Sequence, residues 1–475
     1  MKSELIKHSA IYIGIDTATK ALTFFLWIIL AWLLVPSQIA QYTLAQFLIE
    51  FFTAISILGL DSVILRFYHN QNRDVVLSNA LSILIPSIMF TALLFLLSES
   101  WISLIIVGLS TIIHNNLLLI AAIIITTPIA NVAIMHYIAL QKTSWYAKIL
   151  FVKVFLLFFS AILLAYLGFG VKGLFIAQLI STLSVAILFI LKERDTISTH
   201  HISYEIFKKM AHYGIPLMFT TLSGILAFYF GRLLLDRYAS ATNLGIYSFF
   251  LTLTLQINKG WTSFNQAWTP KIFSDLSNNV REVQENVVSM AFVLSFLYLI
   301  GLAALVILGE LFLFRFIFNE VYRTHIHTFY ILLLAPLFSG IYIVAYPLYY
   351  YGGKTKRILY ISFSLALAEI LVTFFLVQRF NETGAALSIF LMYILIALVY
   401  LSCFKTIMQI PSKIINWTLV LSLLTAASIT SLLKTSSVVL FLIPVMTAAL
   451  LAFFWGELYK YTHTFVNFLN EIRGR

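Results

Sequence analysis

The sequence predicts an all-α protein that crosses a membrane many times. Of its 475 residues, 61% are hydrophobic and 10% are charged, and the mean hydropathy is +0.97. So few polar side chains could not cover the water-exposed surface of a soluble protein. Apolar runs of about 20 residues, long enough to span a bilayer as helices, recur along the whole chain. The alternating ten-residue segments typical of a membrane β-barrel are not found.

We expect about fourteen transmembrane helices. The N-terminal run continues past Pro36 without a small-residue cleavage site, so it predicts an uncleaved first helix. The segment 101–113 is too short to span alone, and we expect it at the membrane interface before the fourth span; if it does span, the topology shifts. The expected spans are 10–35, 41–66, 77–97, 115–138, 146–168, 172–192, 213–236, 244–268, 287–309, 327–350, 357–378, 384–404, 414–433 and 437–457.

The distribution of basic residues predicts the orientation. With the N-terminus inside, 20 of the 30 Lys and Arg residues fall on inner segments, six fall on outer segments and four lie within spans. This is the bias expected when cytoplasmic loops are basic, so both termini are expected in the cytoplasm. The net charge of +11 mostly reflects this bias, which argues against nucleic-acid binding.

Weak internal similarity predicts two six-helix lobes. Ala40-Gln-Tyr-Thr resembles Gly245-Ile-Tyr-Ser, and Val171-Lys-Gly-Leu resembles Glu382-Thr-Gly-Ala, at offsets of about 210 residues. An even-numbered unit repeats in parallel orientation, which gives two lobes with a cavity between them, as in transporters. The mixed-charge loop Lys192–Ala211 is interpreted as a hinge. The expected domains are 1–195, a cytoplasmic linker 196–212, 213–404, and 405–475 with two additional helices and a cytoplasmic tail.

Two lysines lie deep in the expected spans, where a cation must face something wet or anionic. Lys20 is about 15 Å and Lys259 about 22 Å along its span. Lys20 could pair with Asp16 or Glu50, or contact an anionic ligand. Lys259 lies in a hydrophilic run with Gln256 and Asn258, which predicts that this helix lines a cavity.

The other intramembrane charges have local explanations. Lys153 is about 10 Å into its span and can reach the inner surface or act as a third ligand. Arg232 and Asp236 are expected to form a helix-end pair, with Arg232 extended towards the near surface. Glu369 has no basic residue within a turn, so it is either a coupling site for an ion or a protonated structural carboxyl. Asp61 and Arg66 are expected to form a solvated pair at the inner end of the second span.

Several segments together are similar to the Wzx-type polysaccharide flippases of the multidrug/oligosaccharidyl-lipid/polysaccharide exporter superfamily. In two positions the chain departs from the family pattern: Gly231-Arg232 stands where an Asp-Arg pair is usual, and two helices follow residue 404. The segments are LLVPSQIAQYTL (33–44), GLDSVILRFY (59–68), YGIPL (213–217), GIYS (245–248), FNQAWTP (264–270), FNEVYR (318–323) and GGKTK (352–356).

The resemblance implies a fold like that of the multidrug exporters and a flippase in a bacterial inner membrane. Its substrate would be an oligosaccharide repeat unit on undecaprenyl diphosphate, moved from the cytoplasmic to the periplasmic leaflet by alternating access for surface polysaccharide (O-antigen-like, as in lipopolysaccharide) synthesis. Membrane lipid, a polysaccharide polymerase and a chain-length regulator are the implied partners. Because a diphosphate cannot enter hydrocarbon unpaired, buried cations suit this substrate, with Lys20 and Lys259 facing one another across the lumen.

Two other functions stay open at this stage. A cation-coupled multidrug exporter of the same superfamily would share the fold, and a membrane glycosyltransferase or polysaccharide polymerase would need a larger outer loop than this chain offers. We find no nucleophile elbow, phosphate-binding glycine loop or zinc spacing, so an enzyme, a metal or a cofactor is not expected. His325 and His327 are interpreted as surface residues of an outer loop.

Overall fold

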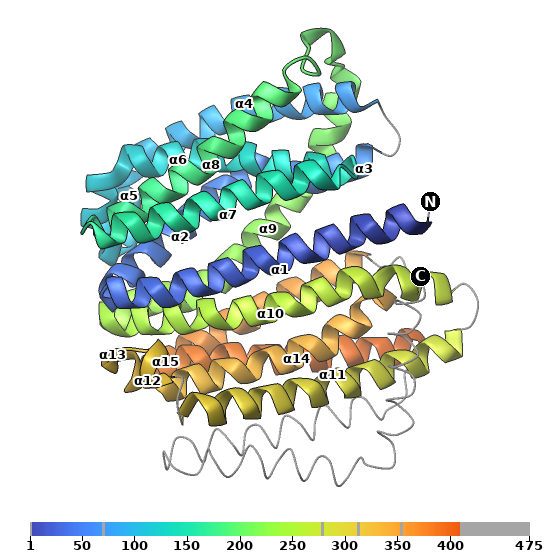
Figure 1. Cartoon of the computed structure of the whole chain (residues 1–475). Helices are drawn as coiled ribbons and strands as arrows, with labels where there is room; N and C mark the ends of the chain where they lie inside the picture. Colours follow the sequence, from blue (N-terminus) through green and yellow to red (C-terminus); the bar gives the residue numbers. More distant parts are fainter. Residues whose placement is uncertain (1, 69–71, 277–279, 311–313, 352–354, 409–475) are drawn as a thin grey trace. The chain divides into compact units, whose positions relative to one another are not determined.

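The computed structural model describes residues 2–68, 72–276, 280–310, 314–351 and 355–408, and every regular element within them is a helix (Figure 1). This confirms the predicted all-α fold. The elements are α1 (Lys2–Leu33), α2 (Pro36–Ile57), α3 (Leu60–Phe67), α4 (Arg73–Leu97), α5 (Glu99–Ile105), η1 (Val107–Leu109), α6 (Ser110–Ala139), α7 (Thr143–Tyr166), α8 (Gly170–Glu193), η2 (Thr199–His201), α9 (Tyr204–Tyr238), α10 (Ala241–Leu276), α11 (Val280–Leu308), α12 (Phe314–Ile317), α13 (Glu320–Arg323), α14 (Ile326–Tyr351) and α15 (Thr355–Met408).

The first twelve expected spans coincide with described helices. Spans 414–433 and 437–457 lie outside the described residues. By length and hydropathy, eight segments in the described part of the chain are suited to cross a membrane: Pro36–Phe67, Arg73–Leu97, Ile112–Ala139, Thr143–Tyr166, Gly170–Glu193, Tyr204–Tyr238, Ile326–Val344 and Phe363–Ser402. Helix α15 contains two expected spans, because a left-handed residue, Asn381 (φ 48°), reverses the chain within it.

The segment 101–113 does not span. Helix α5 has seven residues, and at about 1.5 Å per residue it is far shorter than the hydrocarbon core. A single 3₁₀ turn, η1, then leads into α6. The predicted interfacial segment is therefore confirmed as non-spanning, although Ser110–Ile113 already belong to α6.

The second expected span is not one continuous helix. Leu58 and Gly59 are both left-handed (φ 51° and 70°) and separate α2 from α3. At this break the backbone touches α9, because a Cβ on Gly59 would lie 2.5 Å from the Gly214 carbonyl oxygen. A Cβ on Gly214 would lie 2.2 Å from the Leu58 carbonyl oxygen. The two glycines therefore permit a backbone-to-backbone contact, which small residues make possible between membrane helices.

A second close approach fixes the start of α10. A Cβ on Gly245 would lie 1.8 Å from the carbonyl oxygen of Pro36, the first residue of α2. The sequence segments that begin at Leu33 and Gly245 thus meet through their backbones. This contact explains why glycine, and not a larger residue, occupies position 245.

The chain divides into two compact units, Met1–Phe249 and Phe250–Arg475. This division lies within α10, whereas the sequence predicted lobes separated at 196–212; those lobe boundaries remain a prediction. The predicted linker is attached to the first unit. Asn79 on α4 donates to the His201 carbonyl at 3.0 Å and accepts from the Ser203 amide at 3.0 Å, and Ser78 accepts from the Ser198 amide at 3.2 Å.

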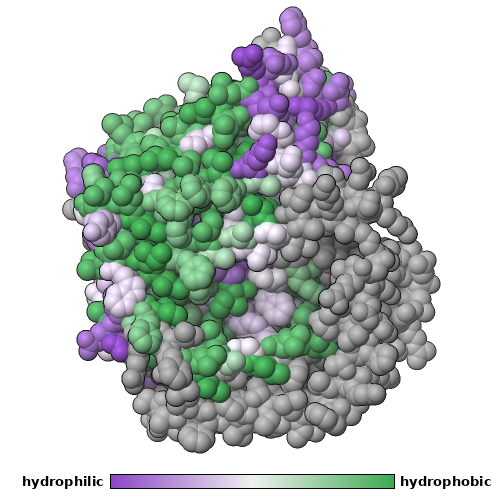
Figure 2. All heavy atoms as spheres, in the orientation of Figure 1, coloured by the Kyte–Doolittle hydropathy of each residue, from purple (hydrophilic) through white to green (hydrophobic). Residues whose placement is uncertain are grey.

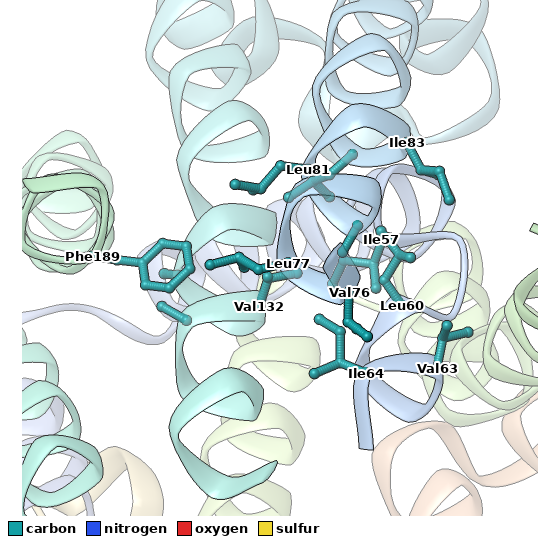
Figure 3. Packing of buried hydrophobic residues seen from close by; sticks show 14 of the residues in the cluster. Ile57, Leu60, Val63, Ile64, Val76, Leu77, Leu81, Ile83, Val132 and Phe189 are labelled. Carbon is teal, nitrogen blue, oxygen red and sulfur yellow. The ribbon is translucent and has the colours of Figure 1, made fainter. Parts of the chain in front are cut away.

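Apolar side chains from α3, α4, α6 and α8 fill the interior of the first unit at the end that carries residues 194–203, which we call the linker end. Figure 3 shows Leu60, Leu77, Val132 and Phe189 packed together there. In Figure 2, hydrophobic residues cover the helices of this unit, and hydrophilic residues gather at the linker end. An apolar surface between polar ends is the arrangement that a bilayer requires.

The Gly59–Gly214 contact predicts a sharp difference between two glycines of α9. Gly214→Ala adds a Cβ against backbone that cannot rotate away, so we expect a loss of about 1–3 kcal/mol in the free energy of unfolding. Gly224→Ala is the matched control, because a Cβ there meets nothing within 4 Å. Thermal unfolding of the purified protein in detergent measures both variants. Equal stability of the two would contradict the close contact.

Candidate functional site

The four intramembrane cations have four different environments. Lys20 on α1 is partly exposed, and Lys259 on α10 is exposed. Lys153 on α7 is partly exposed, and its Nζ donates to Asn131 Oδ1 on α6 at 3.4 Å. Arg232 on α9 is only 3% exposed. Lys20 and Lys259 belong to different compact units, so their predicted approach across a lumen remains a prediction.

Arg232 is not the helix-end partner of Asp236, and this prediction was wrong. Its Cζ lies 4.9 Å from the centre of the Phe228 ring and 4.7 Å from that of Tyr229, one turn earlier on α9. Side chains on a helix lean towards its N-terminus, which here turns Arg232 away from the nearer end of α9. Asp236 instead accepts a hydrogen bond from the Gly108 amide of η1 at 3.1 Å.

The Arg232 guanidinium is stacked but not neutralised. Among the described residues, its Nε and Nη1 have no hydrogen-bond acceptor. Cation–π contacts contribute about 2 kcal/mol when desolvated, which is less than the cost of burying an unpaired ion. A buried guanidinium in this state is suited to receive an anion.

Next to Arg232, α2 contributes Glu50. The Tyr229 hydroxyl hydrogen bonds to the exposed Glu50 carboxylate, and the Tyr229 ring packs 5.5 Å from that of Phe47. Glu50 was predicted as a charge partner of Lys20, and Asp16 as another. The predicted pairing of Glu50 with Lys20 remains a prediction, and the Asp16 side chain lies outside the described residues.

The second unit contains the predicted polar stretch of α10. Lys259 Nζ donates to Gln256 Oε1 at 3.2 Å, and Asn258 Nδ2 donates to the Tyr393 hydroxyl on α15 at 3.1 Å. Glu369, also on α15, is close enough to Tyr393 to act on it electrostatically. The structure therefore joins the predicted Asn258 and Glu369 through Tyr393, a residue that sequence reasoning missed.

Asp61 and Arg66 do not pair with each other, so that prediction was also wrong. Residues five apart on a helix lie on different faces, and only spacings of three or four bring side chains together. Asp61 Oδ1 accepts from the Ser62 amide at 2.8 Å at the start of α3, and Arg66 Cζ lies 4.3 Å from the centre of the Tyr213 ring. Arg66 thus reinforces the contact between the Gly59 break and α9.

Sequence reasoning missed a buried network at the linker end. Glu193, 1% exposed at the end of α8, accepts hydrogen bonds from Arg73 on α4 and from the Tyr137 hydroxyl on α6, the latter at 2.9 Å. His136 Nε2 lies 3.6 Å from Glu193, and His136 Nδ1 shares a 2.6 Å hydrogen bond with the Tyr68 hydroxyl. Burial raises the pKa of the Tyr68 phenol, so the hydroxyl stays protonated.

His325 and His327, at the start of α14, are only partly exposed. His325 Nδ1 lies 3.0 Å from Glu382 Oε1, which starts the second half of α15. His327 is near, with the two ring centres 6.4 Å apart. Among the described residues, no group of three or more His, Cys, Asp and Glu side chains could hold a metal ion.

Comparison with known proteins identifies the family. The family model described as "Polysaccharide biosynthesis protein" matches residues 5–277, more than half of the chain. The chain belongs to this family. No curated protein matches its sequence closely enough to be reported. The predicted resemblance to polysaccharide flippases is thus confirmed at the level of the family.

Solved structures with a similar fold are also membrane transporters. The inward closed conformation of the lipid II flippase MurJ matches with a TM-score of 0.69 at 15% identity, covering 95% of this chain and 99% of that one. An inward-facing multidrug resistance MATE transporter matches with a TM-score of 0.58 at 15% identity, covering 90% and 100%. A transporter from Pyrococcus furiosus matches with a TM-score of 0.57 at 15% identity, covering 85% and 94%. The chain is therefore a multi-pass membrane protein with the fold of this superfamily.

Substitutions of two arginines, the partly exposed Arg73 and the buried Arg232, are expected to have opposite effects on stability. Arg73→Leu removes the cation bound to Glu193 and leaves a buried carboxylate without its ion pair, at a cost of about 3–5 kcal/mol. Arg232→Leu removes a buried cation whose Nε and Nη1 have no hydrogen-bond acceptor among the described residues, so we expect equal or higher stability. Thermal unfolding of both variants in detergent tests this contrast. A larger loss for Arg232→Leu than for Arg73→Leu would mean that Arg232 is bound to an internal anion.

Proposed function

We propose that this protein is a flippase that moves oligosaccharide repeat units linked to undecaprenyl diphosphate from the cytoplasmic to the periplasmic leaflet of a bacterial inner membrane. Transport proceeds by alternating access and supplies surface polysaccharide synthesis. Both termini lie in the cytoplasm. A polymerase and a chain-length regulator act on the delivered repeat units. The family match supports the class, and the side chains below support the substrate.

The observation that carries this proposal is the exposure of Lys259 on a helix long enough to span the membrane. Lys259 is exposed on a 36-residue helix, beside Gln256 and Asn258, and its Nζ donates to Gln256 Oε1 at 3.2 Å. An ammonium that keeps its charge within a membrane-length helix requires water or an anionic ligand. A lumen that admits a hydrated diphosphate and its sugars supplies both, and the amides of Gln256 and Asn258 bind the glycan.

The first unit also contains cations that are suited to an anionic ligand. Lys20 and Lys153 are partly exposed and contact the diphosphate, as expected from the sequence. Arg232 adds a planar guanidinium in which Nε and Nη1 have no acceptor among the described residues, and this planar geometry suits a phosphate well. Glu50, hydrogen bonded to Tyr229, balances part of this positive charge when no substrate is bound.

Coupling to an ion is assigned to Glu369. Its interaction with Tyr393 connects it to Asn258, the neighbour of Lys259 in the chain. A change in the charge of Glu369 would therefore alter the electrostatic environment of Tyr393 and of its hydrogen-bond partner Asn258 on α10. The proposal favours a proton as the coupled ion, because a carboxyl without a basic neighbour on its own helix can exchange one.

Lys259 is tested by substitution in a bacterium that lacks its own flippase gene. Lys259→Ala is expected to abolish surface polysaccharide, and Lys259→Arg is expected to retain part of it, because the charge persists with a different shape. Surface polysaccharide is measured by immunoblot at equal protein levels. Lys209→Ala is the control, since Lys209 is exposed near the linker and pairs with Glu205 at 2.5 Å.

The same assay separates the rival functions. Normal surface polysaccharide in both Lys259 variants would remove Lys259 from the substrate site. A multidrug exporter would instead change drug resistance without restoring polysaccharide. A glycosyltransferase or polymerase would lengthen lipid-linked sugars when the purified protein is incubated with them, without moving them across a vesicle membrane.

Glu369→Gln separates ion coupling from substrate binding. The amide cannot exchange a proton, so transport into proteoliposomes should lose its dependence on an imposed pH gradient. Binding of the lipid-linked oligosaccharide should remain within about twofold of that of the unaltered protein, because Glu369 does not touch the substrate in this proposal. A variant that still responds to the pH gradient would exclude Glu369 as the coupling site.

A further inference from the structure

Two lysines from different helices converge on one tryptophan at the linker end of the first unit. Lys148 Nζ on α7 lies 5.0 Å, and Lys192 Nζ on α8 lies 5.1 Å, from the Trp145 ring centre. The two ammonium groups are therefore at most about 10 Å apart, roughly one Debye length at physiological salt. Both lysines are exposed, and among the described residues neither forms an ion pair with a carboxylate.

Trp145, the ring that both lysines contact, is held in place by its neighbours. Its ring stacks on that of Tyr137, with centres 5.9 Å apart and planes at 20°. The Tyr137 hydroxyl donates to buried Glu193, which also accepts from Arg73. An ordinary interfacial tryptophan is free to reorient among lipids, whereas this one is part of a buried network. The positive charge above it is consequently focused at a fixed point of the surface.

From this point along α7 runs an apolar face that is exposed in the part of the chain that the structure describes. Of the segments suited to span the membrane, Thr143–Tyr166 has the smallest buried share, 17%. Phe151, Phe155 and Phe159 follow one another at helical spacing and are 42%, 39% and 53% exposed. Their rings contact in sequence, with centres 5.4 Å and 4.4 Å apart. On α8, Leu188 and Leu191 are also exposed.

We propose that Trp145, Lys148 and Lys192 form a binding site for the headgroup of an anionic phospholipid of the bilayer, with its acyl chains along the Phe151–Phe159 face. A phosphate between the two ammonium groups relieves their mutual repulsion. The indole, which lies at the boundary between the polar end and the apolar face, fits the glycerol region of a lipid. Charge complementarity thus selects an anionic lipid, and the apolar face beside it selects a lipid and not free phosphate.

Native mass spectrometry of the full-length protein, purified and depleted of lipid, tests this site with phosphatidylglycerol and phosphatidylcholine as probes. For Lys148→Gln/Lys192→Gln we expect binding of the first phosphatidylglycerol to weaken about tenfold or more. Phosphatidylcholine binding should not change. Lys208→Gln/Lys209→Gln is the control, because it removes the same charge near the linker but not at Trp145.

Two results would overturn the proposal. Equal loss of phosphatidylglycerol in both double variants would mean that only the total charge matters. A loss of undecaprenyl phosphate binding with phosphatidylglycerol binding intact would assign the site to the transported lipid. Thermal unfolding of each variant, expected within about 1 °C of the unaltered protein because the substituted lysines are exposed, excludes misfolding as the cause.

Discussion

A charged side chain inside a bilayer needs a counter-ion, an aromatic ring or water, and the structure satisfies this requirement in three ways. Glu193 is bound by Arg73, Tyr137 and Thr196, and these bonds join α4, α6 and α8. Arg232 is held by two aromatic rings, and its Nε and Nη1 have no acceptor among the described residues. Lys259 is exposed beside Gln256. The first arrangement fixes helices, and the second leaves nitrogens of a buried guanidinium without an acceptor among the described residues.

The helices were predictable because membrane thickness sets their length and apolarity. The short α5 was predictable for the same reason, since a run too short to span must lie elsewhere. The break at Leu58–Gly59 was not, because two left-handed residues inside an apolar run leave its hydropathy unchanged. The partner that stabilises this break, Gly214, lies about 155 residues further along the chain, and only the fold brings the two together.

The site was predictable in its residue types but not in its contacts. The spacing of four residues predicted an Arg232–Asp236 pair. Instead, Arg232 points towards the start of its helix, and the Gly108 amide donates a hydrogen bond to the Asp236 carboxylate. A helical spacing describes which residues can meet, and it does not say which competing donor is nearer. Glu193 and Tyr393 were missed because Arg73 and Asn258, their partners, are more than 100 residues away in sequence.

The linker also shows that contacts between distant residues cannot be predicted from the sequence. Its mixed charge predicted a hinge, but Ser78 and Asn79 bind residues 198–203 to α4. Helix α10 instead contains the division between the two units, and it has no glycine or proline between Gly245 and Lys259. Such a helix resists a kink, because sharp bends need those residues or an inserted group. Gly245 is fixed against Pro36, and Lys259 lies about 21 Å further along the same helix. Within the first unit, a displacement of α2 at Pro36 would therefore be transmitted to the start of α10.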